Sequence, residues 1–234
     1  MIDPNTLWFQ TVDTHTLCRG GSNGPQHESQ LYAIDKYVIP LAKQGEVSFL
    51  DYGMGSATTF EAMERDYPIY MSIRIRYKGL DIIPKNVEWC QKNFPQGEFG
   101  YNPSLHKIDE PDKSWDVVYS RHVVDHMESF EKAMDEHKRV AKKLVIAILW
   151  TGFVDSDEHQ IKHITRQWWV DPLNGEEVPH TTQGAIRKEQ TYPNEYTNYY
   201  SRKKVLEYLN DPDWELLEFN EDVGGNQVIV LRRK

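Results

Sequence analysis

The 234-residue sequence predicts an α/β fold in which a mostly parallel sheet carries helices on both faces. Three observations support this fold class. Strand and helix patterns alternate between residues 47 and 150, and a glycine turn follows the first strand. The chain ends in two strand patterns around Gly224 and Gly225, which predict an antiparallel hairpin.

The elements follow one another in a regular order. Apolar residues at helical spacing predict a first helix over 29–43. The predicted strands of the main repeat are 47–51, 73–81, 115–120 and 144–150, and the helices are 57–65, 84–94 and 129–141. A long polar and aromatic segment without clear periodicity then spans 152–198, too long for an ordinary connection. A helix over 201–209 and strands over 214–220 and 227–232 close the chain.

Composition limits the kinds of partner. The net charge of −9 argues against a nucleic-acid backbone as the main partner. The longest apolar run, 144–150, is too short to span a bilayer, and the first residues lack the pattern of a signal peptide. Cys18 and Cys90 lie in no paired motif, which predicts two free thiols and a cytoplasmic location.

The turn after the first strand reads Asp51-Tyr52-Gly53-Met54-Gly55. Glycines let the backbone approach a ligand, and the following helix offers unpaired N–H groups to an anionic group. A dinucleotide fingerprint requires a third glycine where this chain has Thr58, and Asp51 would face two phosphates. A cofactor that carries an ammonium and a sulfonium, and no phosphate, fits Asp51 better.

Two further segments follow later strands. Asp81 ends the second strand, where a carboxylate accepts both hydrogen bonds of a ribose diol, and Ile82 is placed to line an adenine. The strand 115–120 delivers Ser120, Arg121 and His122 at its carboxyl end, the edge at which open α/β sheets bind ligands.

Together these stretches resemble the class I S-adenosylmethionine-dependent methyltransferases. The resemblance is to the broad group with an Asp-x-Gly-x-Gly turn and a Ser-x-His-Val-Leu-Glu-His-like segment. Here residues 120–126 read Ser-Arg-His-Val-Val-Asp-His. The resemblance covers 47–150 and implies a Rossmann-like, seven-stranded sheet with S-adenosyl-L-methionine as cofactor.

The resemblance also implies the cofactor-binding residues, with Asp51 and the two glycines around the methionine part and Asp81 on the ribose. Asn102 stands where the family often has an acid near the adenine amino group, and Ala57 stands where many relatives have glycine. The complete set implied is Asp51, Gly53, Met54, Gly55, Asp81, Ile82, Asn102, Ser120 and Arg121.

The predicted reaction is methylation of a small molecule, on oxygen of a sugar, lipid head group or other metabolite, with nitrogen as the alternative. No Asn/Asp-Pro-Pro-Tyr-type motif follows the fourth strand, where enzymes that methylate amino groups of nucleic acids often carry one. A base is required only when the acceptor must lose a proton, and the candidates are His159, His163 and His122.

The predicted organisation is an N-terminal segment over 1–29 and a methyltransferase domain over 30–234. The first segment is a lid over the cofactor or a tail, and 152–198 is an insertion that caps the acceptor. The aromatic residues in and directly after this insertion wall a pocket or pack in a core or homodimer contact; they are Trp168, Trp169, Tyr192, Tyr196, Tyr199 and Tyr200.

Three rival interpretations stay open at this stage. The His122–His126 and His159–His163 pairs have the spacing of metal ligands, but neither has a third clustered ligand, so no metal is expected. An NAD-dependent oxidoreductase is disfavoured by Asp51. A non-catalytic cofactor-binding module is disfavoured by the intact glycine turn.

Overall fold

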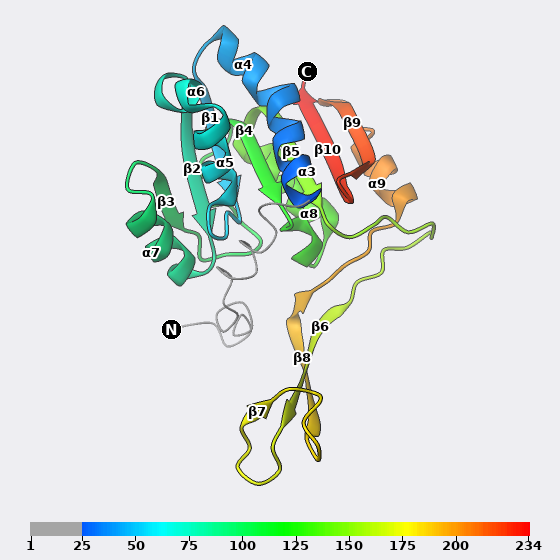
Figure 1. Ribbon diagram of the computed structural model, residues 1–234. Helices are drawn as coiled ribbons and strands as arrows, with labels where there is room; N and C mark the ends of the chain where they lie inside the picture. Colours follow the sequence, from blue (N-terminus) through cyan, green and yellow to red (C-terminus); the bar gives the residue numbers. More distant parts are fainter. Residues whose placement is uncertain (1–24) are drawn as a thin grey trace.

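The computed structural model describes residues 25–234, with side chains described for all of these except 25–28, 166, 192–195 and 221. A seven-stranded sheet of order β3-β2-β1-β4-β5-β10-β9 forms the body (Figure 1). Strands β1 to β5 are parallel, β10 pairs antiparallel with β5, and β9 pairs antiparallel with β10. This confirms the predicted α/β fold and its terminal hairpin.

The strands are β1 (Val47–Tyr52), β2 (Ile75–Asp81), β3 (Glu98–Tyr101), β4 (Trp115–Arg121), β5 (Ala141–Leu149), β6 (His163–Val170), β7 (Glu177–Val178), β8 (Ile186–Tyr196), β9 (Trp214–Val223) and β10 (Asn226–Arg233). The helices are α3 (Pro25–Ala33), η2 (Ile34–Val38), α4 (Ile39–Gln44), α5 (Thr58–Asp66), α6 (Pro68–Ile73), α7 (Pro84–Asn93), η3 (Val124–His126), α8 (Phe130–Val140) and α9 (Arg202–Leu209).

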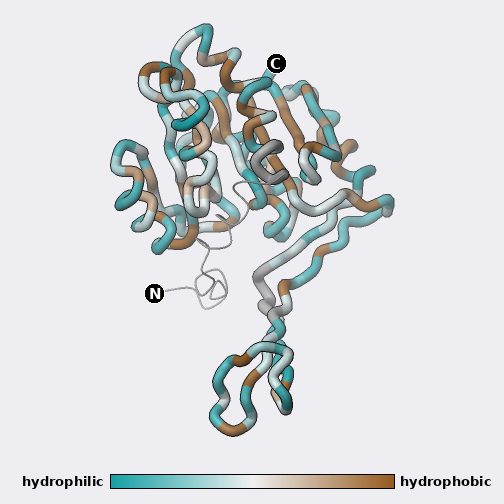
Figure 2. Tube along the Cα trace, viewed as in Figure 1, coloured by the Kyte–Doolittle hydropathy of each residue, from teal (hydrophilic) through white to brown (hydrophobic). Residues whose placement is uncertain are grey.

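Two apolar cores lie on the two faces of the sheet. Alternate residues of β1 point to opposite faces, so Phe49 packs in one core and Leu50 in the other. Helices α3, α5 and α7 cover the first face, and α8 and α9 cover the second. Figure 2 shows the apolar residues concentrated along the strands of the body. Burial on both faces explains why these strands read as near-continuous apolar runs.

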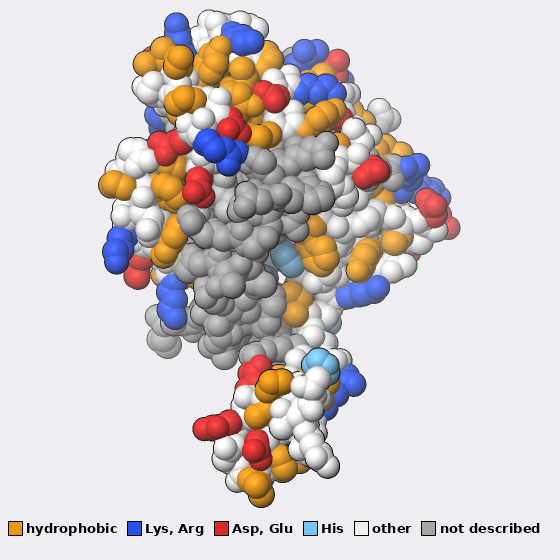
Figure 3. All heavy atoms as spheres, in the orientation of Figure 1, with side chains coloured by type: hydrophobic (Ala, Val, Ile, Leu, Met, Phe, Trp, Pro, Cys, Tyr) orange, Lys and Arg blue, Asp and Glu red, His pale blue; other side chains and the backbone are white. Residues whose placement is uncertain are grey.

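The segment predicted to be irregular, 152–198, instead contains the antiparallel sheet β7-β6-β8. Its strands form an arm that projects from the body (Figures 1 and 3). The arm carries exposed apolar side chains, including Leu173, which is 93% exposed in the loop between β6 and β7. The sequence shows no alternation of polar and apolar residues here, because both faces of this ribbon carry polar and aromatic residues.

Other differences are local. The helix α6 occupies 68–73, so the second strand begins at Ile75 rather than at residue 73. The first helix contains a π-helical turn, η2. Most of the predicted lid segment, 1–29, lies outside the described residues, and so does Cys18. No helix in the described part of the chain is long and apolar enough to cross a membrane.

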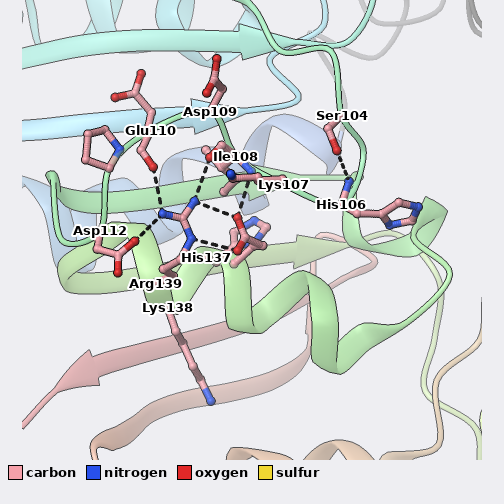
Figure 4. A network of polar contacts seen from close by, with 12 residues as sticks. Ser104, His106, Lys107, Ile108, Asp109, Glu110, Asp112, His137, Lys138 and Arg139 are labelled. Atoms are coloured by element: carbon pink, nitrogen blue, oxygen red, sulfur yellow. Dashed lines mark hydrogen bonds and ion pairs between the residues drawn. The ribbon is translucent and has the colours of Figure 1, made fainter.

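An ionic cluster fixes the loop between β3 and β4 on helix α8. The Arg139 guanidinium donates to the carbonyl oxygens of Ile108 (2.8 Å) and Glu110 (2.9 Å) and to Asp112 (2.6 Å), as Figure 4 shows. Glu136 pairs with Arg139 at 2.9 Å and accepts the Ile108 N–H at 3.0 Å. One arginine therefore anchors the loop to the helix at several points.

We expect Arg139→Ala to lower the free energy of unfolding by about 1–3 kcal/mol, because two carbonyl oxygens and two carboxylates lose a charged donor. Denaturant unfolding of the purified protein measures the change. Arg65→Ala is the matched control, since Arg65 pairs with its exposed neighbour Asp66; there we expect a change within about 0.5 kcal/mol. Equal effects of the two substitutions would contradict the anchoring role of Arg139.

Candidate active site

A pocket opens at the carboxyl ends of β1, β2 and β4, where ligands bind in open α/β sheets. Its volume is about 890 Å³ with the open mouth included. The residues that line it are Asp51, Gly53, Met54, Gly55, Thr58, Thr59, Asp81, Ile82, Ile83, Asn86, Leu105, Arg121, His122, Val123 and His126. Most of the predicted cofactor residues therefore meet in one place.

The glycine turn is shaped by close contacts. Gly53 has φ +74°, and a Cβ there would lie 2.2 Å from Val123 Cγ2. Its N–H donates to the Leu80 carbonyl at 2.8 Å, which ties the turn to β2. Ala57 also adopts a left-handed conformation, with φ +55°. That conformation costs an L residue about 1–2 kcal/mol, and it explains why glycine suits this position in the family the sequence resembles.

Asp81 connects the glycine turn to helix α7. One carboxylate oxygen accepts the Gly55 N–H at 2.8 Å, and the other accepts the Ile83 N–H at 2.8 Å and the Asn86 amide at 3.2 Å. Burial raises the pKa of Asp81 to about 6, although these hydrogen bonds favour the ionised form. The carboxylate is thus preorganised and partly unsatisfied at the pocket wall.

Asp51 lies beside it on β1. The Tyr77 hydroxyl donates to Asp51 at 2.7 Å. Burial raises the pKa of Asp51 to about 6, against the opposing influence of Tyr77 and of the Arg121 charge. Two carboxyl groups therefore line one pocket, and their charged forms call for a cationic or hydrogen-bond-donating ligand.

Arg121 at the end of β4 supplies the positive charge of the pocket. Its guanidinium donates to the Thr58 hydroxyl at 3.0 Å, next to the N-terminus of α5. The buried Gln30 of α3 donates to the neighbouring Thr59 hydroxyl at 2.7 Å. Helix α3 thereby holds the start of α5 against the pocket.

Two histidines line the opposite wall. His122 has φ +58°, and its ring Nε2 lies 2.8 Å from Asn226 Oδ1. Burial lowers the pKa of His122 to about 4, so the ring is neutral at pH 7. His126 Nδ1 lies 2.6 Å from the Tyr196 carbonyl oxygen, at the base of the arm.

Two of the predicted cofactor residues face elsewhere. The buried Asn102 side chain spans its own loop: its amide donates to the Lys107 carbonyl at 3.0 Å, and its oxygen accepts the Asp109 N–H at 2.8 Å. The Ser120 hydroxyl lies 2.9 Å from Nε2 of the buried His137. Internal partners occupy both side chains and neither residue lines the pocket, so a cofactor contact of Asn102 or Ser120 stays a prediction.

Two of the three predicted bases also lie away from the pocket. The ring of His159 pairs through Nε2 with Glu131 at 2.9 Å and accepts the Ser201 N–H on Nδ1 at 2.9 Å. Both nitrogens therefore have structural partners. His163 is exposed at the start of β6, with its ring centroid 5.0 Å from that of Tyr196. Of the three candidates, His122 alone lines the pocket.

Sequence reasoning missed several lining residues. Leu105 comes from the loop that Arg139 anchors, and no local pattern marks it. Thr58 and Thr59 begin α5 directly after the glycine turn. Their position next to that turn is a signal from which they could have been predicted to line the pocket. No described residue of 152–198 lines the pocket, so the predicted acceptor cap stays a prediction. No group of three metal-ligating side chains occurs among residues 25–234 whose side chains are described.

Comparison with known proteins gives a match to one family model and to solved structures of the same fold. Residues 50–149 match the family model described as "Methyltransferase domain". A search of curated proteins finds no match.

Solved structures share the whole fold at low identity. The amino pentose methyltransferase CalS10 from Micromonospora echinaspora, solved with bound SAM, is 13% identical with a TM-score of 0.60, over 95% of this chain and 98% of that one. Magnesium protoporphyrin IX methyltransferase from Synechocystis PCC 6803, also with SAM, is 11% identical with a TM-score of 0.60, over 100% and 99% of the two chains. The PH0226 protein from Pyrococcus horikoshii OT3 is 13% identical with a TM-score of 0.57, over 97% and 99%.

The predicted fold is thereby confirmed. The protein has the class I methyltransferase fold, and residues 50–149 match a family model of the methyltransferase domain.

The raised pKa of Asp51 has a consequence for stability. An aspartate with a folded pKa of about 6 and an unfolded pKa of about 3.9 binds more protons when folded, so its contribution is lost as pH rises from about 4 to 6. We expect Asp51→Asn to gain stability relative to wild type over that range, by up to about 3 kcal/mol, with no further change above pH 7.

Denaturant unfolding of both proteins from pH 4 to 8 measures this difference. Asp116→Asn is the matched control, because the Ser48 N–H and hydroxyl and the Lys143 ammonium hold the pKa of Asp116 below its usual value. Its difference from wild type should change in the opposite direction as pH rises. Parallel pH curves for wild type and Asp51→Asn would refute the assignment.

Proposed function

We propose that the protein is an S-adenosylmethionine-dependent methyltransferase, which binds its cofactor in the pocket at the ends of β1, β2 and β4 and methylates a small molecule there. The observation that carries the proposal is the convergence of two buried carboxyl groups, Asp51 and Asp81, on a glycine turn whose backbone leaves no room for a Cβ at Gly53. Two like charges side by side suit a ligand that brings an ammonium and a diol.

Each part of the cofactor has a matching wall. Asp81, held by Gly55 and Ile83, accepts the hydrogen bonds of the ribose hydroxyls. Asp51 and the glycine turn face the amino group of the methionine part, and Arg121, which donates to Thr58 at the start of α5, faces its carboxylate. Ile82, Ile83 and Leu105 supply the apolar surface for adenine.

When bound, S-adenosylmethionine supplies a methyl group on a sulfonium, a good leaving group for in-line displacement. The residues of this chain then have to align the acceptor and exclude water, which contributes on the order of 7–11 kcal/mol in favourable intramolecular cases. Met54 and Val123 line the pocket with apolar surface, while His122 and His126 supply its polar acceptor wall. The arm base reaches this wall through the Tyr196 carbonyl bonded to His126.

The net charge of the chain and the size of the pocket favour a small-molecule acceptor. The chain has a net charge of −9, and Figure 3 shows charges of both signs scattered over the described surface of that face. The acceptor group is an oxygen of a sugar, lipid head group or other metabolite, with nitrogen as the alternative. One structural neighbour is an amino pentose methyltransferase, which makes an amino sugar one candidate acceptor.

A methyl-transfer screen with labelled cofactor tests the proposal. We expect label in a pool of metabolites and glycans, and no comparable label in parallel pools of RNA and protein. A thermal-shift comparison accompanies it: S-adenosylhomocysteine should raise the melting temperature, and NAD should not. Stabilisation by NAD alone, or label confined to RNA or protein, would refute this function.

We expect Asp81→Asn to weaken S-adenosylhomocysteine binding about 10–100-fold at pH 8, because charge-assisted hydrogen bonds to the ribose are lost. Wild-type affinity should also fall as pH drops below about 6, since Asp81 takes up a proton. The variant should show a shallower pH dependence.

Titration calorimetry at pH 5–8, in buffers of different ionisation enthalpy, measures both effects. Asp109→Asn in the exposed part of the 102–112 loop is the control and should bind like wild type. An unchanged affinity for Asp81→Asn, with its fold intact by thermal unfolding, would remove Asp81 from the site.

A further inference from the structure

His122 lines the pocket, and two residues outside the pocket hold it in place. Its backbone N–H donates to the Ile148 carbonyl of β5 at 2.8 Å, which supports the left-handed backbone conformation. Its ring contacts the terminal hairpin, with Nε2 at 2.8 Å from Asn226 Oδ1. Asn226 begins β10 and does not line the pocket.

The orientation of the Asn226 amide is fixed by a second contact. Its Nδ2 donates to the Gly224 carbonyl at 3.1 Å, inside the β9–β10 turn, and the residue is only 3% exposed. The oxygen of the amide is therefore the atom that faces His122. An amide oxygen only accepts, so Nε2 of His122 must carry the hydrogen.

The other ring nitrogen is then an acceptor. A neutral imidazole with hydrogen on Nε2 has a lone pair on Nδ1. The two nitrogens point to nearly opposite sides of the ring, so Nδ1 is directed away from Asn226. It makes no hydrogen bond with the described residues. Burial and the adjacent Arg121 charge lower the pKa of His122, which keeps the lone pair unprotonated at neutral pH.

We propose that Asn226 is a positioning residue that holds His122 as the Nε2–H tautomer, so that Nδ1 accepts a hydrogen bond from the O–H or N–H of the methyl acceptor. This role rests on the proposed function of the pocket. It specifies the acceptor chemistry further: the methylated group carries a hydrogen, as a hydroxyl or an amine does. A carboxylate has lone pairs alone to offer and would meet the lone pair of Nδ1.

The step balances for both kinds of acceptor. A lone pair of the acceptor atom forms the new bond to the methyl carbon, and the electron pair of the breaking carbon–sulfur bond stays on sulfur. The proton of the hydroxyl or amine leaves along its hydrogen bond to Nδ1 and passes to solvent. No oxidant or reductant is required.

Nitrogen-15 NMR on histidine-labelled protein tests the positioning role directly, with His122→Asn used to assign its signals. We expect wild type to show a single neutral tautomer of His122, with hydrogen on Nε2, from pH 5.5 to 8. A tautomer with hydrogen on Nδ1, a mixture of the two, or titration near pH 6.5 would overturn the proposal.

Asn226→Asp should raise the pKa of His122 from about 4 to about 6.5 or above, because a carboxylate at the same place stabilises the imidazolium. Asn220→Asp is the matched control: it adds the same charge on β9 of the same hairpin and should leave the His122 titration unchanged. If Asn226→Asp does not fold, Asn226→Ala should replace the single tautomer by a mixture.

Two further readouts separate this role from the proposed function. Binding of S-adenosylhomocysteine at pH 8 should be equal for wild type and Asn226→Asp, and its absence in wild type would refute the cofactor site while leaving the tautomer result intact. In the labelled screen, products should be ethers or methylamines. A methyl ester as the main product would refute the predicted acceptor chemistry.

Discussion

The carboxylate of Asp81 is the contact on which the rest of the site depends. It accepts N–H groups from the glycine turn after β1 and from the start of α7 after β2, so one buried side chain sets two loops against each other. Asn86 adds a third bond to the same group. Burial raises the pKa of this carboxyl group, so a ligand that donates hydrogen bonds would stabilise its charged form. Burial also raises the pKa of Asp51, which lies on the neighbouring strand β1.

Fold prediction succeeded where burial leaves a pattern. Strands β1, β4 and β5 are covered on both faces, and their apolar runs were readable as strands. Helix α6 buries none of its residues, so no period marks it. The strands of the arm were not predicted, for a related reason. Strands β6 and β8 pair mainly with each other, so their residues do not alternate between a buried face and an exposed face.

The site was predictable to the extent that its residues lie at strand ends. Asp51, Asp81 and Arg121 follow directly from that rule. The spacing of residues in the sequence does not determine which partner a side chain contacts. Ser120 turns to His137 on α8, and His159 is held by Glu131, partners that are distant in sequence. Such contacts arise only when the helices pack on the sheet, so the local motif carried no sign of them.

The terminal hairpin contributes more than an edge to the sheet. Asn226 lies 104 residues after His122, yet it meets the imidazole because β10 inserts antiparallel beside β5, whose Ile148 carbonyl holds the His122 backbone. A left-handed residue with a buried ring is costly, and it persists where the surrounding contacts determine it. Here β10, the last strand in the sequence, provides one of those contacts. Folding of the C-terminal strand therefore also fixes His122 at the wall of the pocket.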